Sequence, residues 1–313
     1  MKTALLFPGQ GAQYPSMLLD VAEAYPAARE AFDAARQATG RSLLAELGTL
    51  SQEELNQTVN TQPCMLACEL ASLRALQSLG VAFDAAAGFS LGEWAAVVAA
   101  GVMTERDAMR LIVRRAEAMQ RAVPAGEGGM AYILGKDDDF VARLCEEIGD
   151  IVPANYNIQG NVSVAGTSEG IARFLARSEQ EGYLAGKIAV SIPSHCWLMQ
   201  PAVDALKPLI EKLEMQPPKA RLLMNATGET AADVAEIREN LALQLIQPVR
   251  FRKIVDSLLS EGFDTFIEAG PGNTLSKMVK KAAKQQGYTV SVLQAGKAAD
   301  FEKIKAALGG ATT

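Results

Sequence analysis

A five-residue motif, Gly88-Phe89-Ser90-Leu91-Gly92, constrains the fold of this chain more than any other feature. An apolar stretch at residues 81–87 precedes it and predicts a buried strand, and the alanine-rich residues 93–100 that follow predict a helix. In a G-x-S-x-G motif the two glycines let the backbone turn sharply from strand to helix, which leaves the serine hydroxyl exposed at the turn. The motif is short enough to occur by chance in unrelated loops. Because strand, turn and helix follow in the required order, we interpret Ser90 as a candidate nucleophile.

The chain contains a single histidine, His195. A serine hydroxyl needs a general base to react near neutral pH, and histidine is the usual base. His195 is therefore the expected partner of Ser90, although a lone histidine is more often an ordinary hydrogen-bonded polar residue. We find no convincing acid to complete a Ser–His–Asp triad, because the aspartates at 137–139 form a run that is typical of the exposed start of a helix.

The remaining pattern predicts an α/β fold. Strands and helices alternate along most of the chain, which favours a parallel sheet covered by helices on both faces. Between residues 128 and 192 the order changes to βαββαβ, with strands at 129–134, 151–156, 162–165 and 185–192 and helices at 138–148 and 168–182. We therefore predict a large domain of residues 1–127 and 199–313 and an inserted ferredoxin-like subdomain of residues 128–198. His195 lies near the point where the insert returns to the large domain, a plausible cleft between the two.

Composition excludes several classes of partner. The 313 residues are 49% hydrophobic and 21% charged, with a net charge of −6 and a pI near 5.1. No basic tract is interleaved with aromatic residues, so nucleic acid is not an expected partner. The apolar stretches are too short for a membrane span, and residues 1–7 predict a strand rather than a signal peptide. We accordingly expect a cytoplasmic protein with no membrane association.

The four cysteines do not predict a metal site. Cys64 and Cys68 are one helical turn apart in an apolar segment with no histidine nearby, which favours buried structural thiols. Cys196 is next to His195, but adjacent side chains rarely point toward each other, so we interpret it as structural too. Cys145 stands alone.

Several separated motifs resemble the malonyl-CoA:acyl carrier protein transacylases and, more broadly, the acyltransferase domains of fatty-acid and polyketide synthases. The resemblance covers nearly the whole chain and rests on residues 7–13, 60–63, 88–93, Arg115 with Met119 and Gln120, and residues 193–196, 247–249 and 268–272. It implies an α/β-hydrolase-like large domain with a parallel sheet. It also implies an acyltransferase that uses malonyl-CoA as substrate and acyl carrier protein as partner, requires no cofactor, and is a monomer.

The resemblance further implies ping-pong acyl transfer. Ser90 would carry the malonyl group as an ester, and His195 would act as general base and acid. The main-chain N–H groups of Gln10 and Leu91 would form the oxyanion hole. Arg115 would hold the malonyl carboxylate in a bidentate fork, which leaves the neighbouring Arg114 as a surface residue.

Other roles implied by the family concern the histidine and the acyl pocket. A main-chain carbonyl from the segment 244–247 would orient the histidine, and we expect Gln244, with Gln247 aligning nearly as well. Gln62 and Asn157 are further pocket candidates. Phe89 replaces the histidine that usually precedes the nucleophile, and the loss of a polar contact there leaves the choice among malonyl, methylmalonyl and other acyl groups open.

Three alternatives remain at this point. The chain could serve primary fatty-acid synthesis or act on a polyketide assembly line in trans, it could be an acyl hydrolase of the same fold, or it could be a non-enzymatic subunit that docks a carrier domain. Arg115 argues against a hydrolase for uncharged acyl chains. Lys277, Lys280, Lys281 and Lys284 share one helix face, which we interpret as a solvated face ahead of a carrier-protein docking site.

Overall fold

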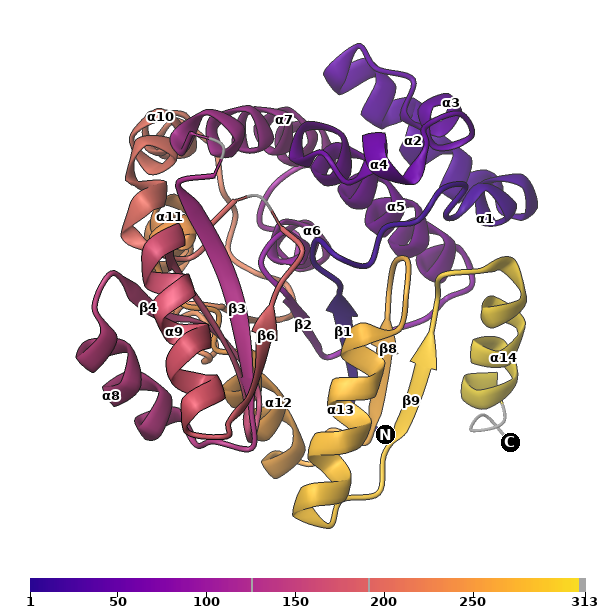
Figure 1. Cartoon of the computed structure of the whole chain (residues 1–313). Helices are drawn as coiled ribbons and strands as arrows, with labels where there is room; N and C mark the ends of the chain where they lie inside the picture. Colours follow the sequence, from indigo (N-terminus) through magenta and orange to yellow (C-terminus); the bar gives the residue numbers. More distant parts are fainter. Residues whose placement is uncertain (125, 191, 310–313) are drawn as a thin grey trace.

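Five parallel strands form the larger of two sheets in the computed structural model, which describes residues 1–124, 126–190 and 192–309 (Figure 1). All four strand pairs are parallel, as predicted. In spatial order the strands are β7 (Arg221–Leu223), β2 (Ala85–Gly88), β1 (Thr3–Phe7), β8 (Thr265–Glu268) and β9 (Ser291–Gln294). The central strand β1 is buried along its whole length, so both of its faces are covered by helices.

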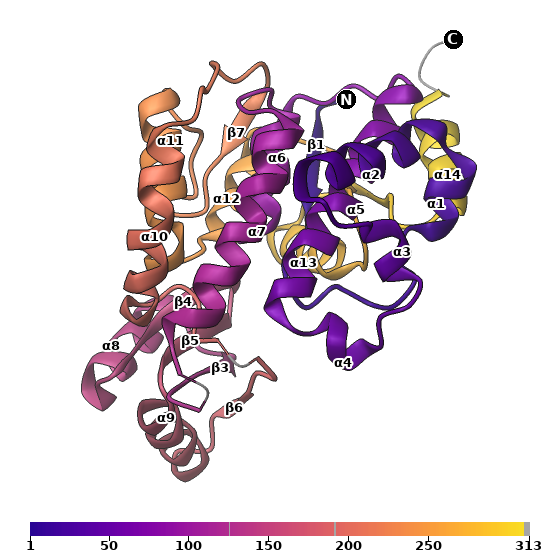
Figure 2. The same ribbon diagram turned by 90° about the horizontal axis from the view of Figure 1, so that it is seen from above.

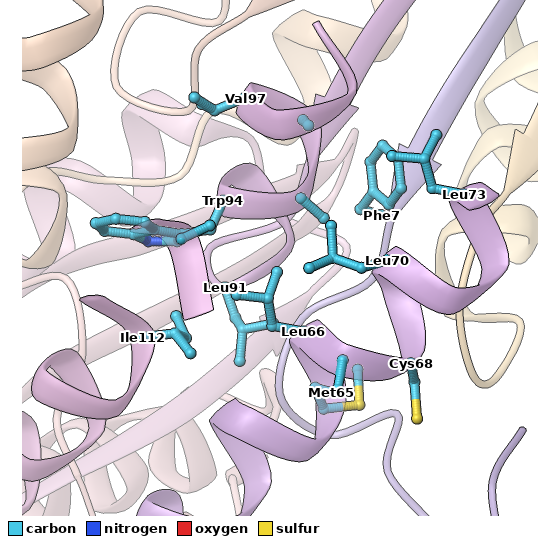
Figure 3. Close-up of a cluster of buried hydrophobic side chains, with 14 of the residues drawn as sticks. Phe7, Met65, Leu66, Cys68, Leu70, Leu73, Leu91, Trp94, Val97 and Ile112 are labelled. Carbon is cyan, nitrogen blue, oxygen red and sulfur yellow. The ribbon is translucent and has the colours of Figure 1, made fainter. Parts of the chain in front are cut away.

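Alternate residues of β1 contribute to two different cores. Leu5 and Phe7 belong to a cluster with helices α2, α5, α6 and α7, whereas Ala4 and Leu6 face helices α12 and α13. Figure 3 shows Leu70 and Leu73 of α5 beside Phe7 in the first of these cores. These helices are α2 (Pro26–Thr39), α5 (Thr58–Ser78), α6 (Gly92–Ala99), α7 (Glu105–Ala122), α12 (Phe251–Ser260) and α13 (Thr274–Gln286).

The remaining helical segments outside residues 128–187 lie around this core. They are α1 (Leu19–Ala24), α3 (Leu43–Leu47), α4 (Gln52–Leu55), η1 (Trp197–Met199), α10 (Gln200–Glu211), α11 (Val234–Leu243), η2 (Gln244–Ile246) and α14 (Ala298–Gly309). Within the described residues, no helix is long and apolar enough to cross a membrane.

Residues 128–187 form a second, four-stranded antiparallel sheet with the strand order β4-β5-β3-β6. The chain order is β3 (Gly128–Leu134), α8 (Asp138–Ile148), β4 (Ile151–Ile158), β5 (Asn161–Thr167), α9 (Ser168–Gln180) and β6 (Leu184–Lys187). This confirms the predicted βαββαβ order, and helix α8 has the predicted bounds. Figure 2 shows this sheet and helices α8 and α9 to one side of the helices that surround the larger sheet.

Two predicted strands are shorter than expected. The strand predicted at 185–192 ends at Lys187, because Val190 N–H donates to the Ile188 carbonyl and bends the chain away from β3. The strand predicted at 81–87 begins only at Ala85, because Val81 N–H donates back to Leu76 and so closes the end of α5. In both cases the apolar sequence runs beyond the part of the segment that pairs in the sheet, and residues 81–84 and 188–190 are exposed or only partly buried.

Main-chain hydrogen bonds at the edge of β4 join the small sheet to the segment between η2 and α12. Tyr156 N–H donates to the Val249 carbonyl, and Val249 N–H donates to the Ala154 carbonyl, both at 2.8 Å. This contact fixes residues 247–250 against the small sheet. The segment that carries Gln244 and Gln247 is thereby held at the junction where His195 also lies.

Candidate active site

Ser90 lies at the sharp turn between β2 and α6, as the motif predicts. Its backbone has φ = 53°, in the left-handed region that costs a non-glycine residue roughly 1–2 kcal/mol. The flanking glycines are required by close packing. A Cβ atom on Gly88 would lie 2.0 Å from the Gly92 carbonyl carbon, and one on Gly92 would lie 2.1 Å from the Phe7 carbonyl oxygen. The helix therefore starts directly against the end of β1.

Asn225, just beyond β7, holds this turn in place. Its Oδ1 accepts a hydrogen bond from Ser90 N–H at 2.7 Å, and its Nδ2 donates to the Gly88 carbonyl at 2.7 Å. One buried amide thus satisfies a main-chain donor and a main-chain acceptor on either side of the strained turn. Nothing in the local sequence distinguishes Asn225 from an ordinary turn asparagine, so this role could not be predicted from the sequence.

His195 is buried, with its Nε2 2.8 Å from Ser90 Oγ. Its Nδ1 lies 3.0 Å from the main-chain carbonyl oxygen of Gln244 and 3.0 Å from that of Gln247. Two acceptors at Nδ1 place the proton there, so Nε2 is free to accept the serine proton. Burial, with the nearby charge of Arg115, lowers the pKa of His195 to about 4, which keeps the imidazole neutral near pH 7.

The family resemblance favours the carbonyl of Gln244, with Gln247 aligning nearly as well, and in the structure His195 contacts both carbonyls. No carboxylate bonds the outer nitrogen of the imidazole among the described residues. The aspartates at 137–139 are far from this role: Asp137 caps the N-terminus of α8 by accepting from Phe140 N–H, in agreement with the prediction.

Arg115, on α7, is almost fully buried beside the serine. Its Nη2 lies 3.3 Å from Ser90 Oγ, and its Nη1 donates to Gln62 Oε1 at 2.6 Å. Burial lowers the pKa of Arg115 to about 10, so the guanidinium stays charged near neutral pH. Arg114 points to solvent and pairs with Glu117 at 3.2 Å, which confirms that it is a surface residue.

A second layer of polar side chains stands behind Arg115. The amide of Gln244 accepts from Arg115 and donates to Glu93, whose other carboxylate oxygen accepts from Asn225 N–H at 2.6 Å. Burial raises the pKa of Glu93 to about 7, against the opposing effects of these hydrogen bonds and of the Arg115 charge. Neither Glu93 nor the side chain of Gln244 was identified from the sequence.

A cavity of about 850 Å³ opens onto Ser90, a size typical of ligand sites. Among the predicted residues, those that line it are Gln10, Phe89, Ser90, Leu91, Arg115, Asn157 and His195. Gln62 does not line it but lies behind Arg115. Residues 188–190 and Ile192, which were predicted to continue a strand, form one of its walls.

Two of the lining side chains, Phe89 and Asn157, make contacts that define the cavity wall. Phe89 packs edge-on against Phe251, with ring centroids 5.5 Å apart. Asn157 Nδ2 donates to Asn161 and Ser163 within the small sheet. The main-chain N–H groups of Gln10 and Leu91 have no hydrogen-bond acceptor within the described part of the chain.

The cysteines and the lysine-bearing helix are outside this site. All four cysteines are free and buried, and the thiol of Cys196 donates a hydrogen bond to the Pro193 carbonyl at 3.1 Å. Burial raises the pKa of Cys196 to about 11, as expected for a structural thiol. No cluster of potential metal ligands occurs in residues 1–124, 126–190 and 192–309. The four lysines of α13 are exposed and do not line the cavity.

The larger sheet is parallel and carries a serine at a strand-to-helix elbow. A neutral histidine contacts that serine, and a buried arginine lies beside both. Together these features define a class of acyl-transfer enzymes that work through an acyl-serine. Comparison with known families agrees with this class. The family model described as "Acyl transferase domain" matches residues 4–306. The chain belongs to the acyl transferase family.

Similar proteins carry a more specific description. The chain is 37% identical over 289 residues to the malonyl CoA-acyl carrier protein transacylase of Bacillus subtilis (strain 168), covering 91% of each chain. It is 39% identical over 283 residues to the protein of the same description from Escherichia coli (strain K12), covering 89% of this chain and 92% of the relative.

Solved structures show the same fold. The malonyl CoA-acyl carrier protein transacylase of Clostridium perfringens superposes with a TM-score of 0.94 at 32% identity, over 99% of this chain and 98% of that one. A malonyl-transacylase solved in complex with its type II polyketide acyl carrier protein gives a TM-score of 0.92 at 35% identity, over 99% and 100% of the two chains.

Proposed function

We propose that this protein transfers a malonyl group from malonyl-CoA to the phosphopantetheine thiol of an acyl carrier protein. The observation that carries the proposal is the position of Arg115, whose buried guanidinium lies 3.3 Å from the hydroxyl of Ser90. An acyl group bonded to that hydroxyl is within reach of a fixed, charged, bidentate donor, which suits a carboxylate. Uncharged acyl groups offer no partner for this charge, which argues against a hydrolase of ordinary acyl esters.

The first half-reaction follows from the Ser90–His195 geometry. As Ser90 Oγ attacks the thioester carbonyl, its proton passes to His195 Nε2, while the other proton stays on Nδ1 and is donated in hydrogen bonds to the main-chain carbonyls of Gln244 and Gln247. The oxyanion that develops would accept hydrogen bonds from the main-chain N–H groups of Gln10 and Leu91, which have no acceptor within the described residues. The imidazolium then returns the proton to the departing CoA thiol, which leaves a malonyl ester on Ser90.

The second half-reaction reverses these steps with a different thiol. The carrier protein's phosphopantetheine thiol loses its proton to His195 and attacks the ester carbonyl, and Ser90 recovers its hydrogen as it leaves. We place the cavity between a large domain of residues 1–127 and 199–313 and a small subdomain of residues 128–198. Asn157, on the small subdomain, would contact the acyl donor, and Phe89 would limit the width of the acyl pocket. Gln62 would act on substrate only through Arg115.

The proposal is tested by intact-protein mass after brief mixing with equal amounts of malonyl-CoA, methylmalonyl-CoA and acetyl-CoA. We expect a malonyl adduct on the wild type and none on Ser90→Ala. In this competition, an acetyl adduct on the wild type that equals or exceeds the malonyl adduct would contradict the assigned role of Arg115. A dominant methylmalonyl adduct would refute malonyl as the substrate and would show that Phe89 leaves room for a branched acyl group.

A further inference from the structure

The side chain of Gln244 lies between two buried ionisable side chains, the carboxyl group of Glu93 and the guanidinium of Arg115. Its Nε2 donates to Glu93 Oε2 at 2.5 Å and to the carbonyl of Ser90 at 2.9 Å. Its Oε1 accepts from Arg115 Nη2 at 3.0 Å and Nε at 3.2 Å, and from Trp94 Nε1 at 3.3 Å. The donor end of the amide therefore faces only acceptors, and the acceptor end faces only donors.

Glu93 fixes this orientation of the amide. At a pH above its pKa of about 7, Glu93 is an ionised carboxylate with no proton to donate, so only the Nε2 end of Gln244 can face it. The reverse orientation would turn the amide N–H groups toward the N–H groups of Arg115, and two sets of donors would then oppose each other. The carboxylate of Glu93 thus decides which end of Gln244 is presented to the guanidinium.

The same arrangement leaves Arg115 available. Glu93, Gln244 and Arg115 are each no more than 2% exposed, so the guanidinium needs a compensating negative charge nearby. Glu93 supplies it from behind the amide, and the hydrogen bonds of Arg115 all go to neutral groups on Gln62, Gln244 and Ser90. A direct ion pair would instead occupy the donors that a substrate carboxylate requires.

We propose that Glu93, acting through the side chain of Gln244, is a positioning residue that aims Arg115 at the acyl group on Ser90 and so sets the preference for a carboxylated acyl group. This inference rests on the proposed function. It assigns to Gln244 a side-chain role that is separate from its main-chain contact with His195.

A purely structural role for Glu93 makes a different prediction. Glu93 Oε1 also accepts from Asn225 N–H, and Asn225 in turn holds the serine turn. If this contact were the only one that mattered, loss of Glu93 would slow acylation by every acyl donor equally. If Glu93 acts through Arg115, the loss is confined to donors that carry a carboxylate.

The test is Glu93→Gln, which keeps an acceptor for Asn225 N–H but removes the charge and brings an amide N–H to the Gln244 side. At pH 8, kcat/KM for acylation by malonyl-CoA should fall about 10- to 100-fold, as for loss of a charge-assisted hydrogen bond, while the value for acetyl-CoA changes less than about 3-fold. Gln244→Met, which keeps the main-chain carbonyl, should give the same malonyl-specific loss. It serves as the second variant if Glu93→Gln does not fold.

The matched control is Glu69→Gln. Glu69 is another fully buried glutamate, on α5, and burial raises its pKa well above the ordinary range, so a neutral amide resembles its protonated form. Both carboxylate oxygens lack a hydrogen-bond partner among the described residues. We expect this variant to keep wild-type kcat/KM for both acyl donors.

A double-mutant cycle completes the test. In an Arg115→Ala background, Glu93→Gln should cause no further loss with malonyl-CoA, because both changes remove the same interaction. Additive losses, or equal losses with malonyl-CoA and acetyl-CoA, would overturn the inference. Failure of the proposed function is distinguishable, since the unmodified protein would then show no preference for malonyl-CoA.

Discussion

Replacing Asn225 with alanine should destabilise the fold and slow acylation of Ser90 at the same time. The side chain makes two 2.7 Å hydrogen bonds, one to the buried Gly88 carbonyl and one to the half-buried Ser90 N–H. An unpaired buried group costs about 1–3 kcal/mol, and loss of an ordinary hydrogen bond costs about 0.5–1.5 kcal/mol. We therefore expect the free energy of unfolding to fall by about 2–4 kcal/mol.

The effect on catalysis follows from the strain at the turn. The left-handed backbone of Ser90 is held by these two hydrogen bonds, so without them the turn relaxes and Oγ moves away from His195. A displacement on the order of 1 Å can cost roughly 100-fold in rate. Urea denaturation measures the stability, and stopped mixing with malonyl-CoA followed by intact mass measures the acylation rate.

The control is Asn240→Ala. Asn240 is also buried, but its Nδ2 has no hydrogen-bond partner in the described part of the chain, so its loss should leave the acylation rate unchanged. The free energy of unfolding of Asn225→Ala could instead lie within ~1 kcal/mol of the wild-type value, the scale of one hydrogen bond. If this variant is also acylated at the normal rate, the proposed support of the turn by Asn225 is refuted.

Three further predictions concern the groups around Ser90. Arg115→Lys should lower kcat/KM for malonyl-CoA about 10- to 100-fold, because one ammonium cannot reproduce a bidentate guanidinium; an unchanged value would show that charge alone suffices. Since the pKa of His195 is lowered to about 4, the imidazole remains a neutral base even when the pH falls below 6.5, the ordinary pKa of histidine. The rate at which an uncharged sulfonyl fluoride modifies Ser90 should therefore stay level from about pH 8 to about pH 5, because this whole range lies above the lowered pKa of about 4. A fall in rate with a midpoint near 6.5, the ordinary histidine pKa, would contradict the lowered pKa of His195. Cys196→Ala should keep malonyl transfer and lose only stability, which thermal denaturation and the transfer assay would separate.

The parts of the site that could be predicted from the sequence are those with local or compositional signals. The elbow at residues 88–92 is a contiguous motif, and the pairing of Ser90 with His195 needed no choice because the chain has one histidine. The βαββαβ order was readable because each strand and helix has its own apolar periodicity. The roles of Gln10, Leu91 and Arg115 came from the family resemblance rather than from these patterns.

The supporting side chains could not be found in this way. Asn225 is 135 positions from Ser90, and Gln244 is 151 positions from Glu93, so no local pattern connects them. Their importance comes from burial, which turns ordinary amides into obligatory hydrogen-bonding partners. Likewise, the apolar residues beyond Lys187 are compatible with a strand and with a cavity wall, and only the tertiary structure separates the two.

The central claim is that the acyl group passes from Ser90 to a carrier-protein thiol. The most direct measurement isolates the malonyl-enzyme, mixes it with holo acyl carrier protein, and follows the intact masses of both proteins, with apo carrier protein as the control. We predict that the malonyl mass leaves the enzyme and appears on the holo carrier protein much faster than it is lost to water, and that the apo protein accepts none. Loss of the ester to water at the same rate with or without holo carrier protein would contradict the account.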